Sequence, residues 1–312
     1  MKRIAIIGEC MIELNGSPFG DMRQSYGGDS LNTAVYLART AGETVAVDYI
    51  SALGCDALSE GMLARWQEEG VNTDHVLRDP LHQPGLYLIQ LDDQGERTFL
   101  YWRDQSAAKN MMQHPQFPEI ETHLRTVDMV YLSGISLAIL PAADRQKLID
   151  LLKELSANNV QIAFDSNYRP ALWKDATEAQ QCYQQIFAMT DIALVTNDDE
   201  RTLWCDVDDE MTLNRLQTSG VKQAVLKMGA EGCLYQHFEQ EKREWITTTP
   251  VEHVVDTTSA GDAFNAGFLA GYLSDKPPGT SALQGHQLAG TIIQHKGAVI
   301  SAEATKHINF NT

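Results

Sequence analysis

The sequence of 312 residues has little of what marks a membrane or secreted protein. No apolar stretch is long enough to span a bilayer, and even residues 129–140 are interrupted by Ser133, Gly134 and Ser136. The N-terminal apolar run, Ile4–Ile7, is shorter than the apolar core of a signal peptide, and no small-residue cleavage site follows it. We therefore expect no membrane partner, and we interpret the N-terminus as a first buried strand.

Cysteine is also scarce, and its spacing argues against a disulfide or zinc framework. The five cysteines are scattered, odd in number and without a C-x-x-C pair. We interpret them as reduced thiols, which predicts a cytoplasmic protein.

Basic residues are few compared with acidic residues. There are 24 Lys and Arg against 42 Asp and Glu, which gives a formal net charge of −18. A surface of this charge repels phosphates, so nucleic acids and anionic membranes are not expected partners. Any anionic ligand therefore needs a local cluster of positive charge.

Several catalytic motifs are missing as well. The absence of G-x-x-x-x-G-K-[ST] excludes a Walker-type NTPase, and no G-x-G-x-x-G follows the first strand, which disfavours a dinucleotide oxidoreductase. H-E-x-x-H and G-x-S-x-G are absent too. We interpret the nine histidines as surface or core polar groups rather than metal ligands.

What the sequence does contain is an alternation of short apolar runs and longer amphipathic patterns. This alternation predicts an α/β fold with a mostly parallel sheet covered on both faces. The expected strands are Arg3–Gly8, Val45–Ser51, Met129–Ser133, Val160–Asp165, Ile192–Thr196 and Ala224–Met228. The expected helices are Ser30–Ala41, Ala57–Glu69, Ala142–Asn158, Glu178–Met189 and Met211–Ser219. Ligands of such sheets bind beyond the carboxyl ends of the strands, where Glu9, Asp165 and Asn197 are expected.

One region interrupts the alternation. Leu86–Leu91 and Thr98–Arg103, joined by a Gly-containing loop, read as a β-hairpin, and Cys10–Leu14 adds a similar strand. We expect a small β-sheet lid, formed by residues of about 10–26 and 84–105 and inserted in one domain that spans residues 1–312. Lys276–Gly279 is predicted to separate two C-terminal helices.

A polar turn of small residues, Asp256–Phe264, runs directly into an apolar helical pattern. The backbone N–H groups of Ala260, Gly261 and Asp262 lie at the start of that helix, where they form an anion site. Asp262 is then placed to accept a proton from an attacking hydroxyl. The alternative is that the turn is only a helix cap.

A second glycine turn, Gly27-Gly28, also enters a helix. Its simpler interpretation is a tight turn in which Asp29 or Ser30 caps the helix. The alternative is a set of backbone and side-chain groups, Asn32 among them, that binds sugar hydroxyls.

Polar residues also follow three predicted strands. Arg169 indicates an anionic ligand, because a cation at a strand's carboxyl end is unusual in so acidic a chain. Asn197 and Glu200 suit the water shell of a phosphate-bound Mg²⁺, although this stretch also suits the acidic first turn of a helix. Lys227–Gly232 is either a loop that approaches a nucleotide or a plain hairpin.

Together these stretches resemble the ribokinase/PfkB family of sugar kinases over essentially the whole chain. Residues 27–42 match its N-terminal signature and Asp256–Asp262 its D-T-x-G-A-G-D signature, with Ser259 where glycine is common. The resemblance implies a ribokinase-like three-layer α/β/α core with a β-sheet lid, Asp262 as the catalytic base and an anion hole formed by the amides of Ala260 to Asp262. The departure at Ser259 bears on the backbone conformation there, and its hydroxyl offers a further phosphate contact.

The resemblance also implies binding residues. For the sugar they are Gly27, Gly28, Asp29, Asn32, Tyr87, Tyr101, Arg103, Arg169 and Asp262. For ATP they are Asn167, Arg169, Asn197, Lys227, Gly229, Ala230, Glu231, Gly232, Ser259, Ala260 and Gly261, with Glu200 as a Mg²⁺ ligand through water and residues 289–298 near the adenine. Some family members further suggest a K⁺ site near Asp256 and Thr258.

Within the family the chain is most similar to members that phosphorylate 2-keto-3-deoxygluconate at its terminal hydroxyl. Arg103 and Arg169 suit the carboxylate of such an acid, and Tyr87 and Tyr101 either orient it or pack across the hairpin. Gluconate and galactonate configurations both remain compatible. The alternatives are a kinase of a neutral sugar of the fructokinase or ribokinase type, and a catalytically silent sugar sensor. The exposed edges of the lid also predict a homo-oligomer.

Overall fold

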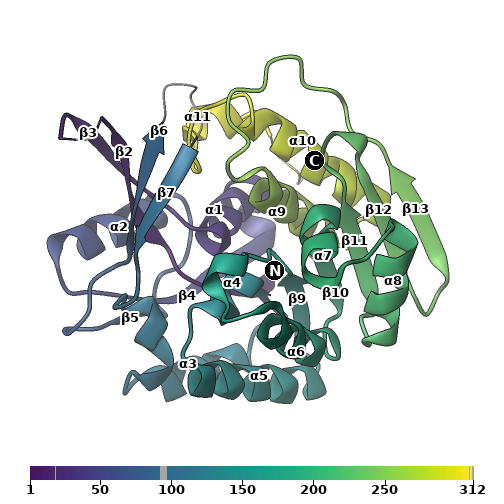
Figure 1. The fold of residues 1–312 in the computed structure, drawn as a ribbon, viewed down its shortest axis with the longest axis horizontal. Coiled ribbons are helices and arrows are strands. Elements are labelled where there is room, and N and C mark those ends of the chain that lie inside the picture. Colours follow the sequence, from purple (N-terminus) through teal and green to yellow (C-terminus); the bar gives the residue numbers. More distant parts are fainter. Residues whose placement is uncertain (18, 92–96, 309, 311–312) are drawn as a thin grey trace.

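A large central sheet organises the molecule. A computed structural model describes residues 1–17, 19–91, 97–308 and 310. The strands of this sheet are β1 (Lys2–Ile7), β4 (Val45–Leu53), β5 (Val76–Arg78), β8 (Met129–Ser133), β9 (Gln161–Asp165), β10 (Ile192–Thr196), β11 (Gln223–Lys227), β12 (Cys233–His237) and β13 (Lys242–Ile246). In space they follow the order β13-β12-β11-β10-β9-β8-β1-β4-β5 (Figure 1). Neighbours from β5 to β11 pair in parallel, and β12 and β13 add antiparallel strands at one edge.

The six strands expected from the sequence are confirmed, with ends shifted by at most two residues. They form because short apolar runs, buried on both faces, pack best as parallel strands between helices. All five residues of β8, for example, are buried.

Helices cover both faces of this sheet. They are α1 (Asp29–Ala41), α2 (Ala57–Glu68), α3 (Phe117–Leu124), α4 (Gly134–Ala138), α5 (Ala142–Ala157), α6 (Ala176–Phe187), α7 (Asn197–Trp204), α8 (Asp209–Thr218), α9 (Ala260–Leu273), α10 (Pro278–Ile292) and α11 (Ala302–Thr305). Short 3₁₀ segments lie at Gly42–Thr44, Ala108–Gln113, Pro170–Leu172 and Gly229–Glu231. The five helices expected from the sequence are confirmed to within two residues at each end. Among the described residues, no helix combines the length and apolar character needed to cross a membrane.

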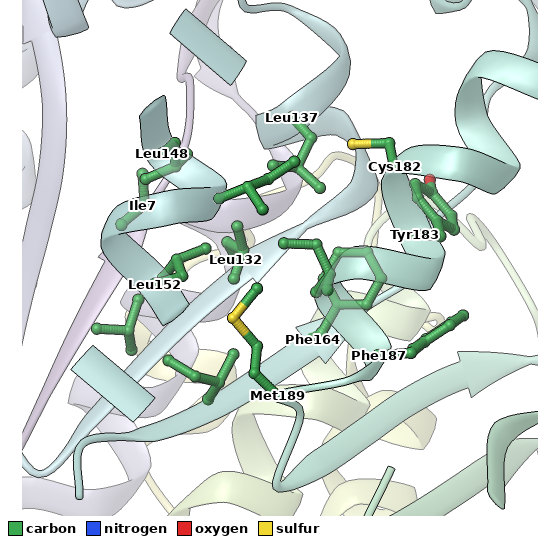
Figure 2. Packing of buried hydrophobic residues seen from close by; sticks show 14 of the residues in the cluster. Ile7, Leu132, Leu137, Leu148, Leu152, Phe164, Cys182, Tyr183, Phe187 and Met189 are labelled. Carbon is green, nitrogen blue, oxygen red and sulfur yellow. The ribbon is translucent and has the colours of Figure 1, made fainter. Parts of the chain in front are cut away.

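Two hydrophobic cores fill the spaces between sheet and helices. Successive strand residues point to opposite faces, so Ile7 of β1 belongs to one core and Ile6 to the other. The first core packs α3, α5, α6 and α8 against the sheet; Figure 2 shows Leu152 of α5 beside Leu132 of β8. The second core packs α1, α2, α9 and α10 on the opposite face. The predicted three-layer α/β/α core is therefore confirmed.

A second, smaller sheet stands beside this core. Its strands are β2 (Met11–Gly16), β3 (Met22–Gly27), β6 (Leu86–Leu91) and β7 (Arg97–Trp102), in the order β3-β2-β6-β7 (Figure 1). The predicted hairpin is confirmed by the antiparallel pairing of β6 with β7, and its loop, residues 92–96, lies outside the described residues. The strand expected at Cys10–Leu14 corresponds to β2.

Helices α9 and α10 pack against each other near the C-terminal end of the chain. Residues 274–277 separate α9 from α10, so the predicted break is confirmed, although Pro278 and Gly279 of the expected stretch Lys276–Gly279 already belong to α10. The two helices approach closely at Gly267, where an added Cβ atom would lie 2.7 Å from the carbonyl oxygen of Gln284. The N-terminus of α9 lies at the carboxyl ends of the parallel strands.

Candidate active site

A cleft of about 670 Å³ opens at the carboxyl ends of β1, β9, β10 and β11. The N-termini of α1 and α9 border it on one side and the small sheet on another. Ligands of parallel α/β sheets bind at this edge, because the strand ends and helix N-termini meet there. Most of the residues expected at a site line this one cleft: Gly27, Gly28, Asp29, Asn32, Tyr87, Tyr101, Arg103, Asn167, Arg169, Lys227, Ser259, Ala260, Gly261 and Asp262.

The N-terminus of α9 has no side-chain cap. Its N-cap residue, Ser259, has the left-handed backbone conformation (φ 67°), and its hydroxyl has no hydrogen-bond partner in the described structure. Serine thus adopts here the conformation that glycine favours. The amide of Ala260 donates to the carbonyl of Thr257 at 3.2 Å. The first amides of a helix lack an intrahelical acceptor, so those of Gly261 and Asp262 are available to an anion. The anion site that includes Ala260 stays a prediction.

Asp262 lies on the wall of the cleft, held by a hydrogen bond from α1. The Asn32 side-chain amide donates to its carboxylate at 2.8 Å. Burial, followed by the nearby charge of Asp29, raises the pKa of Asp262 to about 7. A carboxyl group with such a pKa is suited to accept a proton near neutral pH.

A buried cation lies beneath the start of α9. The Lys227 ammonium, at the end of β11, contacts Asn265 at 3.0 Å and Asp165 at 3.4 Å. An added Cβ atom on Gly261 would lie 3.8 Å from this ammonium, so the positive charge is adjacent to the free amides. Asn265 also donates to Asp165 at 2.6 Å, which fixes the network.

The second glycine turn starts α1 without the predicted cap. The N-cap residue is Gly28, and neither Asp29 nor Ser30 caps the helix. The Ser30 hydroxyl instead pairs with Tyr49, and Asp29 accepts a hydrogen bond from Asn167 at 2.8 Å. The capping interpretation is therefore wrong, and Asp29 faces the cleft.

Aromatic and charged residues of the small sheet border the cleft. Tyr87 donates to the buried carboxylate of Glu13, and burial together with that charge raises the pKa of the tyrosine, which stays neutral. The rings of Tyr87 and Tyr101 lie 6.0 Å apart, so they pack across the hairpin as well as facing the cleft. Arg103 forms an ion pair with Glu9.

Arg169 lies at the outer part of the cleft. Its side chain is 51% exposed and pairs with Asp199 at 3.2 Å. Burial is the main cause that raises the pKa of Asp199, and Arg169 opposes that shift. The two arginines expected at the site therefore lie in the same cleft, each beside an acidic residue.

Asn197 and Glu200 do not line the cleft. Glu200 is fully buried and pairs with Arg215 of α8 at 2.6 Å, while its neighbours Asp198 and Asp199 line the cleft instead. The helical period turns Glu200 away from the strand ends and toward the core. In the described ranges, no group of three or more His, Cys, Asp or Glu residues could hold a metal ion.

The predicted nucleotide loop is also the connection of a hairpin. β11 and β12 pair antiparallel on either side of residues 228–232. Only Lys227 of this stretch lines the cleft; Gly229, Ala230, Glu231 and Gly232 do not. Gly232 packs against Thr247, where the segment that borders a second cavity begins.

This second cavity has a volume of about 430 Å³. Residues 247–253 and one side of α10, including Leu283, His286 and Gly290, line it. The chain then continues from His253 to Thr257 at the main cleft, so one segment borders both cavities.

Sequence reasoning assigned no role to several residues of the cleft. Glu9, Asp165, Asp198 and Asp199 line it, and Asn265 supports it from the buried network. Their positions directly at strand ends placed Glu9 and Asp165 at this edge of the sheet, but no role in binding or catalysis was predicted for them. Asn265 gave no signal, because it occupies an ordinary position within an apolar helix.

Comparison with known proteins extends over nearly the full chain. A family model described as pfkB family carbohydrate kinase matches residues 1–305. The 2-dehydro-3-deoxygluconokinase of Haemophilus influenzae is 53% identical over 309 residues, which cover 99% of this chain and 98% of that protein. The enzyme of the same name from Dickeya dadantii is 45% identical and covers 97% of this chain and 98% of its own.

The fold also has close counterparts among solved structures. A putative ribokinase II from Escherichia coli, in complex with ATP and Mg²⁺, superimposes with a TM-score of 0.82 at 21% identity. The match covers 96% of this chain and 94% of that one. The α/β/α core with its smaller sheet is thus ribokinase-like.

Proposed function

We propose, from the premise that this chain belongs to the pfkB family of carbohydrate kinases, that it transfers the γ-phosphoryl group of ATP to 2-dehydro-3-deoxygluconate, the sugar acid also written 2-keto-3-deoxygluconate. One observation carries the proposal: Asp262, the free amides at the start of α9 and the guanidinium groups of Arg103 and Arg169 share one cleft. A base, an anion site and cations for a carboxylate are what phosphorylation of a sugar acid requires.

Asp262 acts as the general base. Its carboxylate accepts the proton of the terminal hydroxyl of the acid, while Asn32 holds the side chain in position. The product is the 6-phosphate. Tyr87 and Tyr101 orient the acid, and its carboxylate binds Arg103 and Arg169.

The phosphates fit the start of α9. The amides of Gly261 and Asp262 and the ammonium of Lys227 offset their charge, and the Ser259 hydroxyl, which has no partner among the described residues, adds a donor. The second cavity, between residues 247–253 and α10, receives the adenine. This cavity overlaps residues 289–298, the region expected near the adenine, because Gly290, Thr291 and Gln294 line it.

Magnesium, when bound, neutralises charge on the phosphates. Asp198 and Asp199 line the cleft at the carboxyl end of β10, so they suit its water shell. Glu200, engaged by Arg215 outside the cleft, supports α7 in this proposal.

The small sheet serves as the lid of a single domain. Its strands carry Tyr87, Tyr101 and Arg103, so closing it over the acid excludes water and limits hydrolysis of ATP.

A substrate panel tests the proposed reaction. ADP release is measured with 2-dehydro-3-deoxygluconate, with its neutral analogue, and with fructose and ribose. We expect a clear preference for the acid, because a neutral sugar leaves both arginines without an anionic partner. A preference for a neutral sugar would assign the cleft to a fructokinase or ribokinase type of reaction, and no ADP release with any sugar would indicate a sensor.

A K⁺ site near Asp256 is part of the proposal. This buried carboxylate accepts hydrogen bonds from the amides of Thr258 and Gly297, so it links the turn before α9 to the segment after α10. A cation here orders the anion site. Activity in KCl should exceed activity in choline chloride at equal ionic strength; equal rates would contradict the site.

A further inference from the structure

Glu9 connects the core to the small sheet. It directly follows Gly8 at the carboxyl end of β1, and only 3% of its surface is exposed. Its Oε2 forms an ion pair with the Nη2 of Arg103, which lies just after β7. Glu9 and Arg103 are 94 positions apart in the sequence, and their ion pair lies in the cleft proposed to bind the sugar acid.

Each member of this pair has one polar atom that is not satisfied. Glu9 Oε1 and Arg103 Nε are both buried and have no hydrogen-bond partner in the part of the chain that the structure describes. Buried polar groups in this state are rare, because each has lost its hydrogen bonds to water. One is an acceptor and the other a donor, so a ligand with a hydroxyl and a carboxylate satisfies both.

Gly85 packs closely against the unsatisfied acceptor. A Cβ atom added to this residue would lie 2.8 Å from Glu9 Oε1 and 3.3 Å from the Cβ of Arg103. The same Cβ atom would lie 2.9 Å from the Cγ of Met11, so this position has no room for a side chain. An alanine would force the carboxylate of Glu9 or its neighbours to shift.

We propose that Glu9 is a specificity-determining residue of the sugar-acid site. Its Oε1 accepts a hydrogen bond from a secondary hydroxyl of the substrate, and its Oε2 orients Arg103 for the carboxylate. A carboxylate only accepts, so a hydroxyl directed at Oε1 is favoured and a hydroxyl of the opposite configuration leaves Oε1 without a donor. Glu9 therefore distinguishes the gluconate from the galactonate configuration. This inference rests on the proposed function.

The test compares Glu9→Ala and Glu9→Gln with the wild type. For each protein, kcat and KM are measured with the two epimeric 2-dehydro-3-deoxy acids, together with the KM for ATP. In Glu9→Ala we expect the KM for the preferred acid to rise about 10- to 100-fold, as expected for a lost hydrogen bond to a charged group, and the preference between epimers to disappear. The amide oxygen of Glu9→Gln still accepts, so this variant should keep part of the preference. The KM for ATP should stay within about twofold, since ATP binds elsewhere in the cleft.

Two further variants exclude a merely structural effect. Gly85→Ala places a methyl group against Oε1, so it should displace the carboxylate of Glu9 and raise the KM for the acid with no change for ATP. Asp144→Ala removes another buried, ion-paired carboxylate, one that contacts Lys147 and Gln113 outside the cleft, and should leave the epimer preference unchanged. If Glu9→Ala does not fold, Glu9→Gln and Gly85→Ala decide the matter.

The outcomes separate this inference from the proposed function. A wild type that phosphorylates both epimers equally, or Glu9 variants that keep the wild-type preference and KM, would overturn the role of Glu9 alone. Failure of the wild type to phosphorylate any sugar acid would overturn the proposed function itself.

Discussion

At the scale of single residues, the carboxylates that line the cleft differ in the groups that surround them. Asp262 has a neighbouring negative charge and an amide donor, and its pKa rises to about 7. Asp165 instead lies against the ammonium of Lys227 and the amide of Asn265. Residues of the same type therefore differ in their surroundings: we propose Asp262 as the base, whereas Asp165 holds the ammonium of Lys227.

Replacing Asp262 with asparagine should remove the base and little else. The amide has the same shape, so the variant should fold, bind ATP and the acid, and turn over about 100- to 10,000-fold more slowly. Steady-state kinetics and equilibrium binding of each ligand measure this. Turnover near that of the wild type would refute the role of Asp262.

The rate should also follow the titration of Asp262. The base works in its ionised form, and its pKa of about 7 lies above the ordinary carboxyl value, so protonation removes activity as the pH falls through 7. We expect kcat/KM to drop about tenfold per pH unit on the acidic side and to level off above neutrality. Asp29→Asn, which removes one cause of the raised pKa, should move this limb to lower pH; an unchanged midpoint would contradict the assignment.

At the scale of elements, the site is built from two uncapped helices whose N-termini meet. Asn32 of α1 bonds to Asp262 of α9, and both helices pack in the same core. A side-chain cap would occupy the amides that an anion needs, so its absence at α9 is consistent with a binding role.

Helices α7 and α8 are joined by a buried ion-pair cluster. Arg215 contacts Glu200 and Asp206, both at 2.6 Å and both buried. Arg215→Ala leaves two buried carboxylates without their cation and should lower the free energy of unfolding by about 3–5 kcal/mol. Urea denaturation measures this value.

The matched control is Arg243→Ala, which removes an exposed pair with Glu210 and should cost less than about 1 kcal/mol. The concentration of Mg²⁺ needed for half-maximal activity should not change in folded Arg215→Ala, since Glu200 lies outside the cleft. A large shift in that Mg²⁺ concentration would indicate that Glu200 contributes to metal binding.

At the scale of the whole molecule, the small sheet leaves apolar surface uncovered. Strand β7 forms one edge of this sheet, and Phe99, Leu100, Tyr101 and Trp102 are all exposed. An exposed apolar edge strand is a site for pairing with another chain. We propose that a second copy of this chain covers it.

Trp102→Glu should therefore shift the protein toward a monomer of 34.7 kDa, because a charge cannot be buried cheaply in an apolar interface. Light scattering measures the mass. Trp245→Glu, an exposed tryptophan on edge strand β13 of the large sheet, should assemble like the wild type. A monomeric wild type would refute the interface.

The sequence by itself determined the local elements, and it predicted a base and an anion site at the turn before α9. Apolar runs such as Met129–Ser133 can satisfy their backbone and bury both faces only as central strands. The order of small residues, Asp262 and an apolar helix predicted the base together with its anion site, because these groups are neighbours in the chain.

The tertiary structure alone decided which distant groups meet. The packing of separate elements pairs Glu9 with Arg103 and Glu200 with Arg215. No pattern in the local sequence predicts these pairs. Glu200 lies away from the cleft because of the rotation of its helix. The Ala260 amide donates to the Thr257 carbonyl because of the geometry of the turn. Ion pairs and hydrogen bonds act over a few ångströms, so their partners follow from the fold and not from spacing along the chain.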